Sequence, residues 1–176
     1  MKLLAFAASS SRKSINKQLV TYAASLVTGA DVEILDLNDY ELPLFSQDRE
    51  DELGQPELAQ TFLAKIQACD ALMISFAEHN GSYSAAYKNL FDWCSRIDPK
   101  VFQNKPMVML ATSPGKRGGT GVLTAATASA PFFKGELKGS LSVPSFHENF
   151  ESGKIVNSEL ADKLQEVVNL YLAQTA

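Results

Sequence analysis

Three apolar runs constrain the fold more than any other feature of this sequence. They cover Leu3 to Ala8, Ala71 to Ala77 and Met107 to Thr112, and none shows the alternation of a half-exposed strand. Such runs are typical of strands that are covered on both faces of a parallel sheet. Polar residues interrupt two weaker runs, Val32 to Leu37 and Leu137 to Val143, which we therefore expect nearer the edges of that sheet.

Segments with helical periodicity separate these runs. Helices are expected over five of them: residues 15–26, 58–66, 85–95, 121–133 and 158–171. Pro56 is well placed for a first helical position, and Ser158 for the N-cap of the last helix. The acidic stretch 38–55 is interpreted as a solvated loop, with a lid or a partner surface as the alternative. Because right-handed crossovers place a helix between successive parallel strands, the sequence predicts an α/β fold: a five-stranded parallel sheet with helices on both faces.

Length and composition predict a single soluble domain, residues 1–176. The chain has 45% hydrophobic and 20% charged residues, and its net charge of -4 argues against a nucleic-acid partner, which normally requires a basic face. No run approaches the roughly 18 apolar residues of a membrane span, and LLAFAAS near the start is too short for a secretory signal. Cys69 and Cys94 show no metal-type or disulfide-framework spacing. We therefore expect no metal, no membrane and a reducing, cytoplasmic location.

A serine-rich segment, ASSSRKSIN at residues 8–16, joins the first apolar run to the first helical segment. In parallel α/β sheets ligands bind beyond the carboxyl ends of the strands, and a helix N-terminus there favours an anion. Polar groups for a phosphate come from the hydroxyls of Ser9, Ser11 and Ser14, the amide of Asn16 and the guanidinium of Arg12. A serine-rich turn in which Ser14 only caps the helix is the alternative. The glycines of GxGxxG and the GxxxxGK[ST] pattern are absent from this segment.

Two further loops follow the second and third of the strong apolar runs. Asn80, Gly81 and Ser82 form a turn signal with little side-chain bulk, against which a flat heterocycle could stack. The stretch SPGKRGGTG at residues 113–121 is rich in glycine, so it can approach a ligand closely and bring Lys116 and Arg117 beside it. A mobile solvated loop is the alternative. Together the loops supply an anion site, a flat-ring site and a glycine-rich wall, an arrangement that matches FMN.

The stretches SSSRKSIN, AEHNGSYSAAYKNLFDWCSR and SPGKRGG resemble, in order and in position, the motifs of the NADPH-dependent FMN reductase family of flavodoxin-like proteins. The resemblance implies a three-layer flavodoxin-like sandwich. It also implies contacts to the FMN phosphate from Ser9, Ser11, Arg12, Ser14 and Asn16. Contacts to the ribityl chain and ring are implied for Glu78, His79, Asn80, Gly81 and Ser82. The residues implied beside the pyrimidine edge are Ser113, Gly115, Lys116 and Arg117.

The same resemblance implies an NAD(P)H-dependent oxidoreductase. A hydride would pass from NADPH or NADH to bound FMN and then to a small-molecule acceptor such as a flavin or quinone, by a ping-pong mechanism that needs no catalytic side chain. Relatives commonly form homodimers or homotetramers. The alternatives are an FMN-binding electron carrier that never meets a nicotinamide, and a flavin-free interaction protein. A hydrolase is disfavoured, because His79 and His147 are accompanied by no GxSxG elbow.

Overall fold

The computed structural model describes residues 1–173 of the chain. Its central sheet contains the strands β1 (Lys2–Ala8), β2 (Asp31–Leu35), β3 (Ala71–Phe76), β6 (Pro106–Thr112) and β7 (Glu136–Val143). The strand order is β2-β1-β3-β6-β7, and every adjacent pair is parallel. Counted over these five strands, the order is 2-1-3-4-5, which is the flavodoxin-like arrangement. The predicted five-stranded parallel sheet is confirmed.

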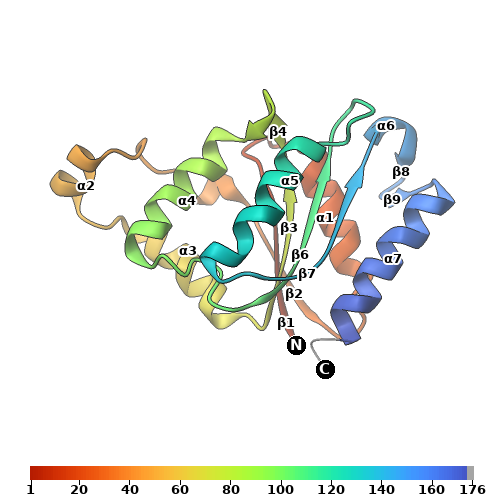
Figure 1. Ribbon diagram of the computed structural model, residues 1–176, viewed down its shortest axis with the longest axis horizontal. Helices are drawn as coiled ribbons and strands as arrows, with labels where there is room; N and C mark the ends of the chain where they lie inside the picture. Colours follow the sequence, from red (N-terminus) through yellow and green to blue (C-terminus); the bar gives the residue numbers. More distant parts are fainter. Residues whose placement is uncertain (174–176) are drawn as a thin grey trace.

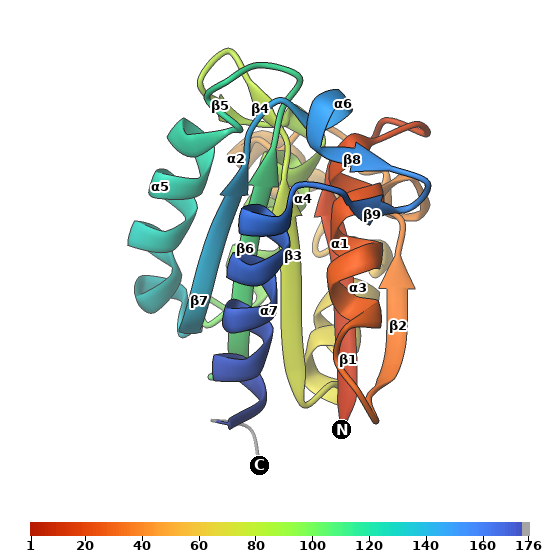
Figure 2. The same cartoon turned by 90° about the vertical axis from the view of Figure 1, so that its right-hand side faces the viewer.

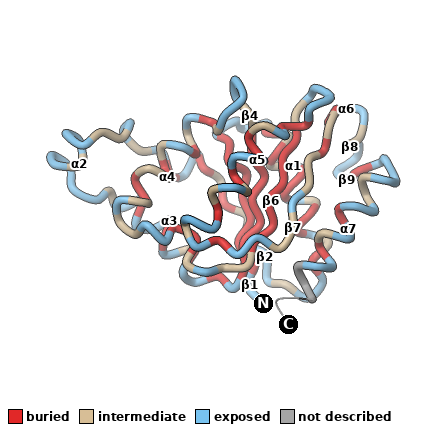
Figure 3. The backbone as a smooth tube through the Cα atoms, viewed as in Figure 1, coloured by how far each residue is buried: buried red, intermediate tan, exposed pale blue. Residues whose placement is uncertain are grey.

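Helices cover both faces of the sheet, as predicted (Figures 1 and 2). They are α1 (Ile15–Ser25), α3 (Glu57–Ala68), α4 (Ala85–Ile97), α5 (Thr120–Ser129) and α7 (Ser158–Ala173). Successive side chains of a strand point to opposite faces. Leu4 and Phe6 of β1 accordingly pack with α3, α4 and α5, whereas Leu3 and Ala5 pack with α1 and α7. Burial on both faces, visible at the centre of Figure 3, explains why the strong apolar runs do not alternate.

The acidic stretch 38–55 is largely exposed, as predicted, but it is not an irregular loop. It contains most of the 3-10 helix η1 (Leu37–Tyr40) and all of the helix α2 (Gln47–Leu53). Strand β2 ends at Leu35 because Asp36 already accepts the N–H of Asn38 at the start of η1. The indole Nε1 of Trp93 on α4 donates to the Pro43 carbonyl at 2.7 Å. This stretch is therefore fixed to α4.

Two helix starts are displaced by one residue from their predicted positions. The helix α7 begins at Ser158, and its N-cap acceptor is the Oδ1 of Asn157, which receives the Leu160 N–H at 3.1 Å. Pro56 is itself the N-cap of α3 and lies just before its first turn. The predicted helix over 121–133 is α5 followed by the 3-10 helix η2 (Ala130–Phe133).

Several short elements lie near the carboxyl end of the sheet, in the upper part of Figure 2. They are β4 (Glu78–His79), β5 (Ser82–Tyr83), α6 (Phe146–Asn149), β8 (Phe150–Glu151) and β9 (Lys154–Ile155). Strands β4 and β5 form an antiparallel hairpin directly after β3, and β8 and β9 form a second hairpin before α7. Across residues 1–173, no helix combines the length and the apolar character needed to cross a bilayer.

Candidate functional site

The loops that follow β1, β3 and β6 meet at the carboxyl end of the sheet (Figure 2). An open cleft of about 270 Å³ lies between them. Its walls are formed by Ser9, Ser11, Lys13, Ser14, Ile15, Asn16, Ala77, Glu78, His79, Thr112, Ser113 and Pro114. Three loops that are far apart in the sequence thus border one cleft, where parallel sheets place their ligands.

The β1–α1 loop presents hydrogen-bond donors to this cleft. The Oγ of Ser14 accepts the Lys17 N–H at 3.2 Å, so Ser14 is the N-cap of α1, the role that the alternative interpretation of this segment gave it. Among residues 1–173, the backbone N–H groups of Ile15 and Asn16 have no acceptor. The first turn of α1 also carries no acidic side chain that could neutralise the helix dipole. Free N–H groups at the positive end of a helix form an anion site.

Asn16 occupies a more structural position than its assignment to the phosphate suggests. The side chain is only 3% exposed. Its Oδ1 accepts the Thr112 N–H at 3.0 Å and the Ser75 hydroxyl at 2.8 Å, while its Nδ2 donates to the Thr112 carbonyl at 3.2 Å. These bonds tie the start of α1 to the ends of β3 and β6. One amide hydrogen of Asn16 is left for a ligand.

Lys17, in the first turn of α1, is not available to an anion, because its ammonium forms an ion pair with Asp36. This hydrogen bond, assisted by the backbone N–H of Asn38, lowers the pKa of Asp36 from 3.8 to about 2. The pair fixes the start of α1 against the end of β2.

The Asp36 carboxylate should make folding stability depend on pH. Because the pKa of Asp36 is lower in the folded state than in the unfolded state, its ion pair stabilises the fold. This stabilisation is fully present above about pH 4 and is lost as the pH falls toward 2. Because the Lys17–Asp36 pair is partly exposed, we expect it to contribute about 1 kcal/mol to the free energy of unfolding. Asp36→Asn should therefore be less stable than the wild type at pH 7, and the two should converge near pH 2. Urea unfolding at several pH values would measure this, and a constant difference between pH 7 and pH 2 would contradict it.

The loop after β3 is a tight hairpin whose tip is exposed. Asn80 and Gly81 adopt positive φ angles of 52° and 78°. Asparagine and glycine adopt such angles more readily than other residues, which is why this pair predicted a turn. Glu78 has a definite partner, because its Oε2 accepts the Val122 N–H at 2.8 Å near the N-terminus of α5. Gly121 leaves room for this carboxylate, since a Cβ there would lie 2.7 Å from the same oxygen. The Glu78 carboxylate thus holds the hairpin against α5 while bordering the cleft.

The glycine-rich loop after β6 is anchored to the polypeptide that follows β7. The Ser113 and Gly115 carbonyls accept the N–H groups of Phe146 and Ser145 at 3.0 and 2.9 Å. Gly118, with φ of 60°, lies against Pro144, where a Cβ would come within 2.9 Å of the Pro144 nitrogen. Hydrogen bonds and close packing therefore give this loop a defined path.

Four cationic side chains on these loops are exposed: Arg12, Lys13, Lys116 and Arg117. None of them forms an ion pair with any residue from 1 to 173. The chain as a whole has a net charge of -4. The loops around this cleft therefore carry four cations without an ion pair in the described part of the chain, and their charge would attract an anionic ligand.

The structure places all the sequence-predicted site residues on these three loops but lines the cleft with only some of them. Those that line it are Ser9, Ser11, Ser14, Asn16, Glu78, His79 and Ser113. Those that lie on the loops outside its lining are Arg12, Asn80, Gly81, Ser82, Gly115, Lys116 and Arg117. The lining residues that sequence reasoning missed are Lys13, Ile15, Ala77, Thr112 and Pro114. Lys13 carried a usable signal as a cation within the serine-rich loop, and Pro114 lay within the glycine-rich loop. Ile15, Ala77 and Thr112 were counted as helix or strand positions.

Comparisons with known proteins agree with this geometry. Residues 1–145 match the model of a family described as NADPH-dependent FMN reductase. An NAD(P)H-dependent FMN reductase of Pseudomonas aeruginosa is 33% identical over 119 residues, which are 67% of this chain and 63% of that protein. An NADPH:quinone oxidoreductase of Arabidopsis thaliana is 36% identical over 93 residues, which are 53% of this chain and 46% of the relative. The matched segments thus span less than two thirds of either relative.

The fold has counterparts among solved structures. A flavoenzyme NAD(P)H:(acceptor) oxidoreductase from Paracoccus denitrificans superimposes with a TM-score of 0.81 over 99% of this chain and 96% of that chain, at 22% sequence identity. At this identity the likeness concerns the fold, and it supports the three-layer arrangement of sheet and helices described above.

Proposed function

Because this chain belongs to the NADPH-dependent FMN reductase family, we propose that it is an oxidoreductase that uses bound FMN to carry a hydride from NAD(P)H to a small-molecule acceptor, a flavin or a quinone, in a ping-pong sequence. The family uses FMN with NAD(P)H as electron donor. The observation that supports the proposal most is the cleft itself, which combines free helix N–H groups, hydroxyl donors and unpaired cations on three converging loops.

The donor set of the β1–α1 loop fits a phosphate monoester. The N–H groups of Ile15 and Asn16 would point at the phosphate oxygens, and the Ser9, Ser11 and Ser14 hydroxyls border the same part of the cleft. Arg12, exposed and without an ion pair among residues 1–173, would supply the full charge. These groups would hold the phosphate end and so fix the position of the ring.

The other two loops would flank the flavin ring. The exposed turn at Asn80 and Gly81 offers backbone groups without bulk, and Ser113 and Gly115 lie on the opposite loop. When bound, FMN supplies the hydride chemistry. Lys116 or Arg117 would face either the ring edge where negative charge develops or the 2′-phosphate of NADPH. The chain's part is to bind, to orient and to exclude water.

An anaerobic reduction tests the proposed function. The purified chain is loaded with FMN, freed of excess, and mixed with NADPH or NADH while the visible flavin absorbance is followed. We expect rapid bleaching, followed by recovery of the absorbance when a quinone is added. FMN that is retained but not bleached would favour the electron carrier over the reductase. Failure to retain FMN would reject the flavin site and favour the flavin-free interaction protein.

We also propose a homodimer or homotetramer in a reducing cytoplasm. Phe132 of η2 is 83% exposed and Leu44 is 69% exposed, and a contact between subunits on this side would bury both. Both flank α4, against which η2 packs through Phe133 and to which the Leu44 segment is fixed. Cys69 and Cys94 are buried free thiols, which suits a reducing compartment.

A further inference from the structure

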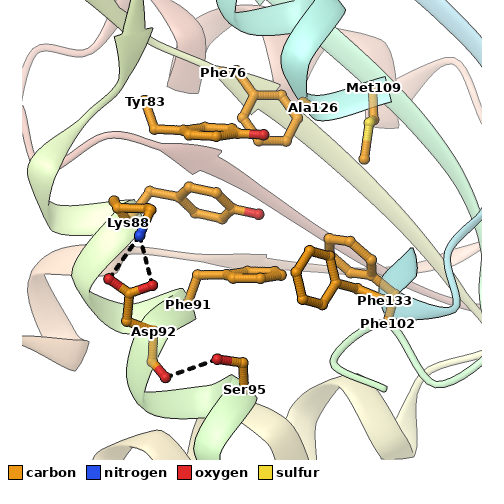
Figure 4. A pocket seen from close by; sticks show the side chains of 11 residues that line it. Phe76, Tyr83, Lys88, Phe91, Asp92, Ser95, Phe102, Met109, Ala126 and Phe133 are labelled. Carbon is orange, nitrogen blue, oxygen red and sulfur yellow. Dashed lines mark hydrogen bonds and ion pairs between the residues drawn. The ribbon is translucent and has the colours of Figure 1, made fainter. Parts of the chain in front are cut away.

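A second cavity, separate from the cleft, lies between α4 and the segment formed by α5 and η2 (Figure 4). It is partly open to solvent and has a volume of about 150 Å³. Its aromatic lining comes from distant parts of the chain: Phe76, Tyr83, Tyr87, Phe91, Phe102 and Phe133. Met109 and Ala126 complete the apolar wall. A mainly apolar cavity of this size is large enough for one six-membered ring, and far too small for FMN or a nicotinamide nucleotide.

The aromatic walls are already arranged in the geometries that rings prefer. Phe91 and Phe133 meet edge to face, with centroids 4.7 Å apart and planes at 87°. Phe76 and Tyr87 meet in the same way at 5.3 Å and 89°. A flat aromatic guest could continue these contacts, since offset and edge-to-face pairs form at centroid distances of about 4.5 to 7 Å.

The Tyr87 hydroxyl distinguishes this cavity from a simple gap in the packing. Tyr87 lines it and is only 5% exposed, yet its hydroxyl forms no hydrogen bond with any residue from 1 to 173. The neighbouring Tyr83 hydroxyl does have a partner, the Ser129 hydroxyl at 3.3 Å. Burial raises the pKa of Tyr87 well above 10, so the phenol stays protonated and can donate. Buried polar groups are almost always paired, and an unpaired one calls for a ligand or a water.

The charge around the cavity selects a neutral guest. Lys88 and Asp92 are the only charged residues in its lining, and they neutralise each other through contacts of 2.7 and 2.8 Å, drawn as dashed lines in Figure 4. The remaining lining is apolar or aromatic apart from hydroxyl groups. We propose that this cavity binds a small monocyclic phenol or quinone. Its ring packs among the aromatic walls, and its oxygen accepts a hydrogen bond from the Tyr87 hydroxyl.

The cavity touches the reverse side of the hairpin that borders the cleft. Tyr83 lines the cavity, whereas its cross-strand partner Glu78 lines the cleft. A guest in the cavity would therefore contact the hairpin without entering the cleft. Binding can be tested on the full chain with or without FMN, and the result does not depend on the proposed reductase activity.

The test titrates the full chain, saturated with FMN, into 4-fluorophenol or fluorobenzene. The ¹⁹F NMR signal of each probe reports its binding. We expect saturable binding of both. Tyr87→Phe removes only the hydroxyl, so it should weaken 4-fluorophenol about tenfold, the scale of one lost hydrogen bond, and leave fluorobenzene unchanged. Tyr22→Phe, on α1 at the other face of the sheet, is the matched control and should change neither affinity.

Two outcomes would overturn the proposal. One is equal 4-fluorophenol affinity of the wild type and Tyr87→Phe. The other is the absence of saturable 4-fluorophenol binding to the wild type; if Phe132→Ser then gains binding, a side chain of a second copy fills the cavity. Ala126→Leu, which fills the cavity from α5, should abolish binding of both probes if the site is correctly placed.

Discussion

Asn16→Ala should lower the free energy of unfolding by about 3 to 5 kcal/mol, because it removes the partner of several buried groups at once. The Thr112 N–H and the Ser75 hydroxyl donate to Asn16 Oδ1, and the Thr112 carbonyl accepts from its Nδ2. Asn16 is 3% exposed and Ser75 is fully buried, so water cannot easily replace these bonds. Each buried polar group left unpaired costs about 1 to 3 kcal/mol. For a chain of 176 residues the melting temperature should fall by about 10 °C.

Chemical denaturation of the apoprotein would measure this loss, with Ser11→Ala as the control. Ser11 lies on the same loop, is exposed, and its hydroxyl has no partner among residues 1–173. Its replacement should change stability by less than about 0.5 kcal/mol. A loss below about 1 kcal/mol for Asn16→Ala would contradict the structural role and return this residue to the phosphate site alone.

The sequence predicted the sheet well because burial on both faces leaves a strong pattern. Continuous apolar runs marked β1, β3 and β6 within a residue or two of their observed ends. The helix α2 escaped detection for the opposite reason. None of its residues is buried, so the segment Gln47–Leu53 shows no apolar periodicity. Its ends are set by Ser46, whose Oγ accepts the Arg49 N–H, and by Gly54 with φ of 68°. Such local caps are hard to recognise without an apolar stripe between them.

The candidate site was predictable as a place but not as a set of contacts. The order of strands and loops was enough to bring the serine-rich, NGS and glycine-rich segments to one edge of the sheet. The partners of Asn16 and Glu78 were not predictable, because Thr112 and Val122 lie far away in the sequence. A polar residue in a predicted binding loop can equally hold that loop in place, and only the three-dimensional register distinguishes the two roles.

Arg12→Ala should weaken FMN binding about 10- to 100-fold, the scale of one charge-assisted hydrogen bond of about 1.5 to 3 kcal/mol. Arg12 is exposed and has no ion pair within residues 1–173, so its loss should leave stability almost unchanged. The N–H groups of Ile15 and Asn16 would remain, which is why binding should weaken without vanishing. Quenching of FMN fluorescence during titration with apoprotein would give the dissociation constants.

Lys100→Ala provides the control for charge. Lys100 is exposed, follows α4 near the end of the sheet opposite the cleft, and its removal makes the net charge more negative by the same amount. A specific contact from Arg12 predicts that only Arg12→Ala loses affinity at about 0.15 M salt, where charges beyond roughly 8 Å are screened. Equal losses for both variants would mean that the general field of the chain, and not the β1–α1 loop, attracts the phosphate. Unchanged affinity of Arg12→Ala would remove Arg12 from the site and leave the helix N-terminus and serine hydroxyls as its anion-binding groups.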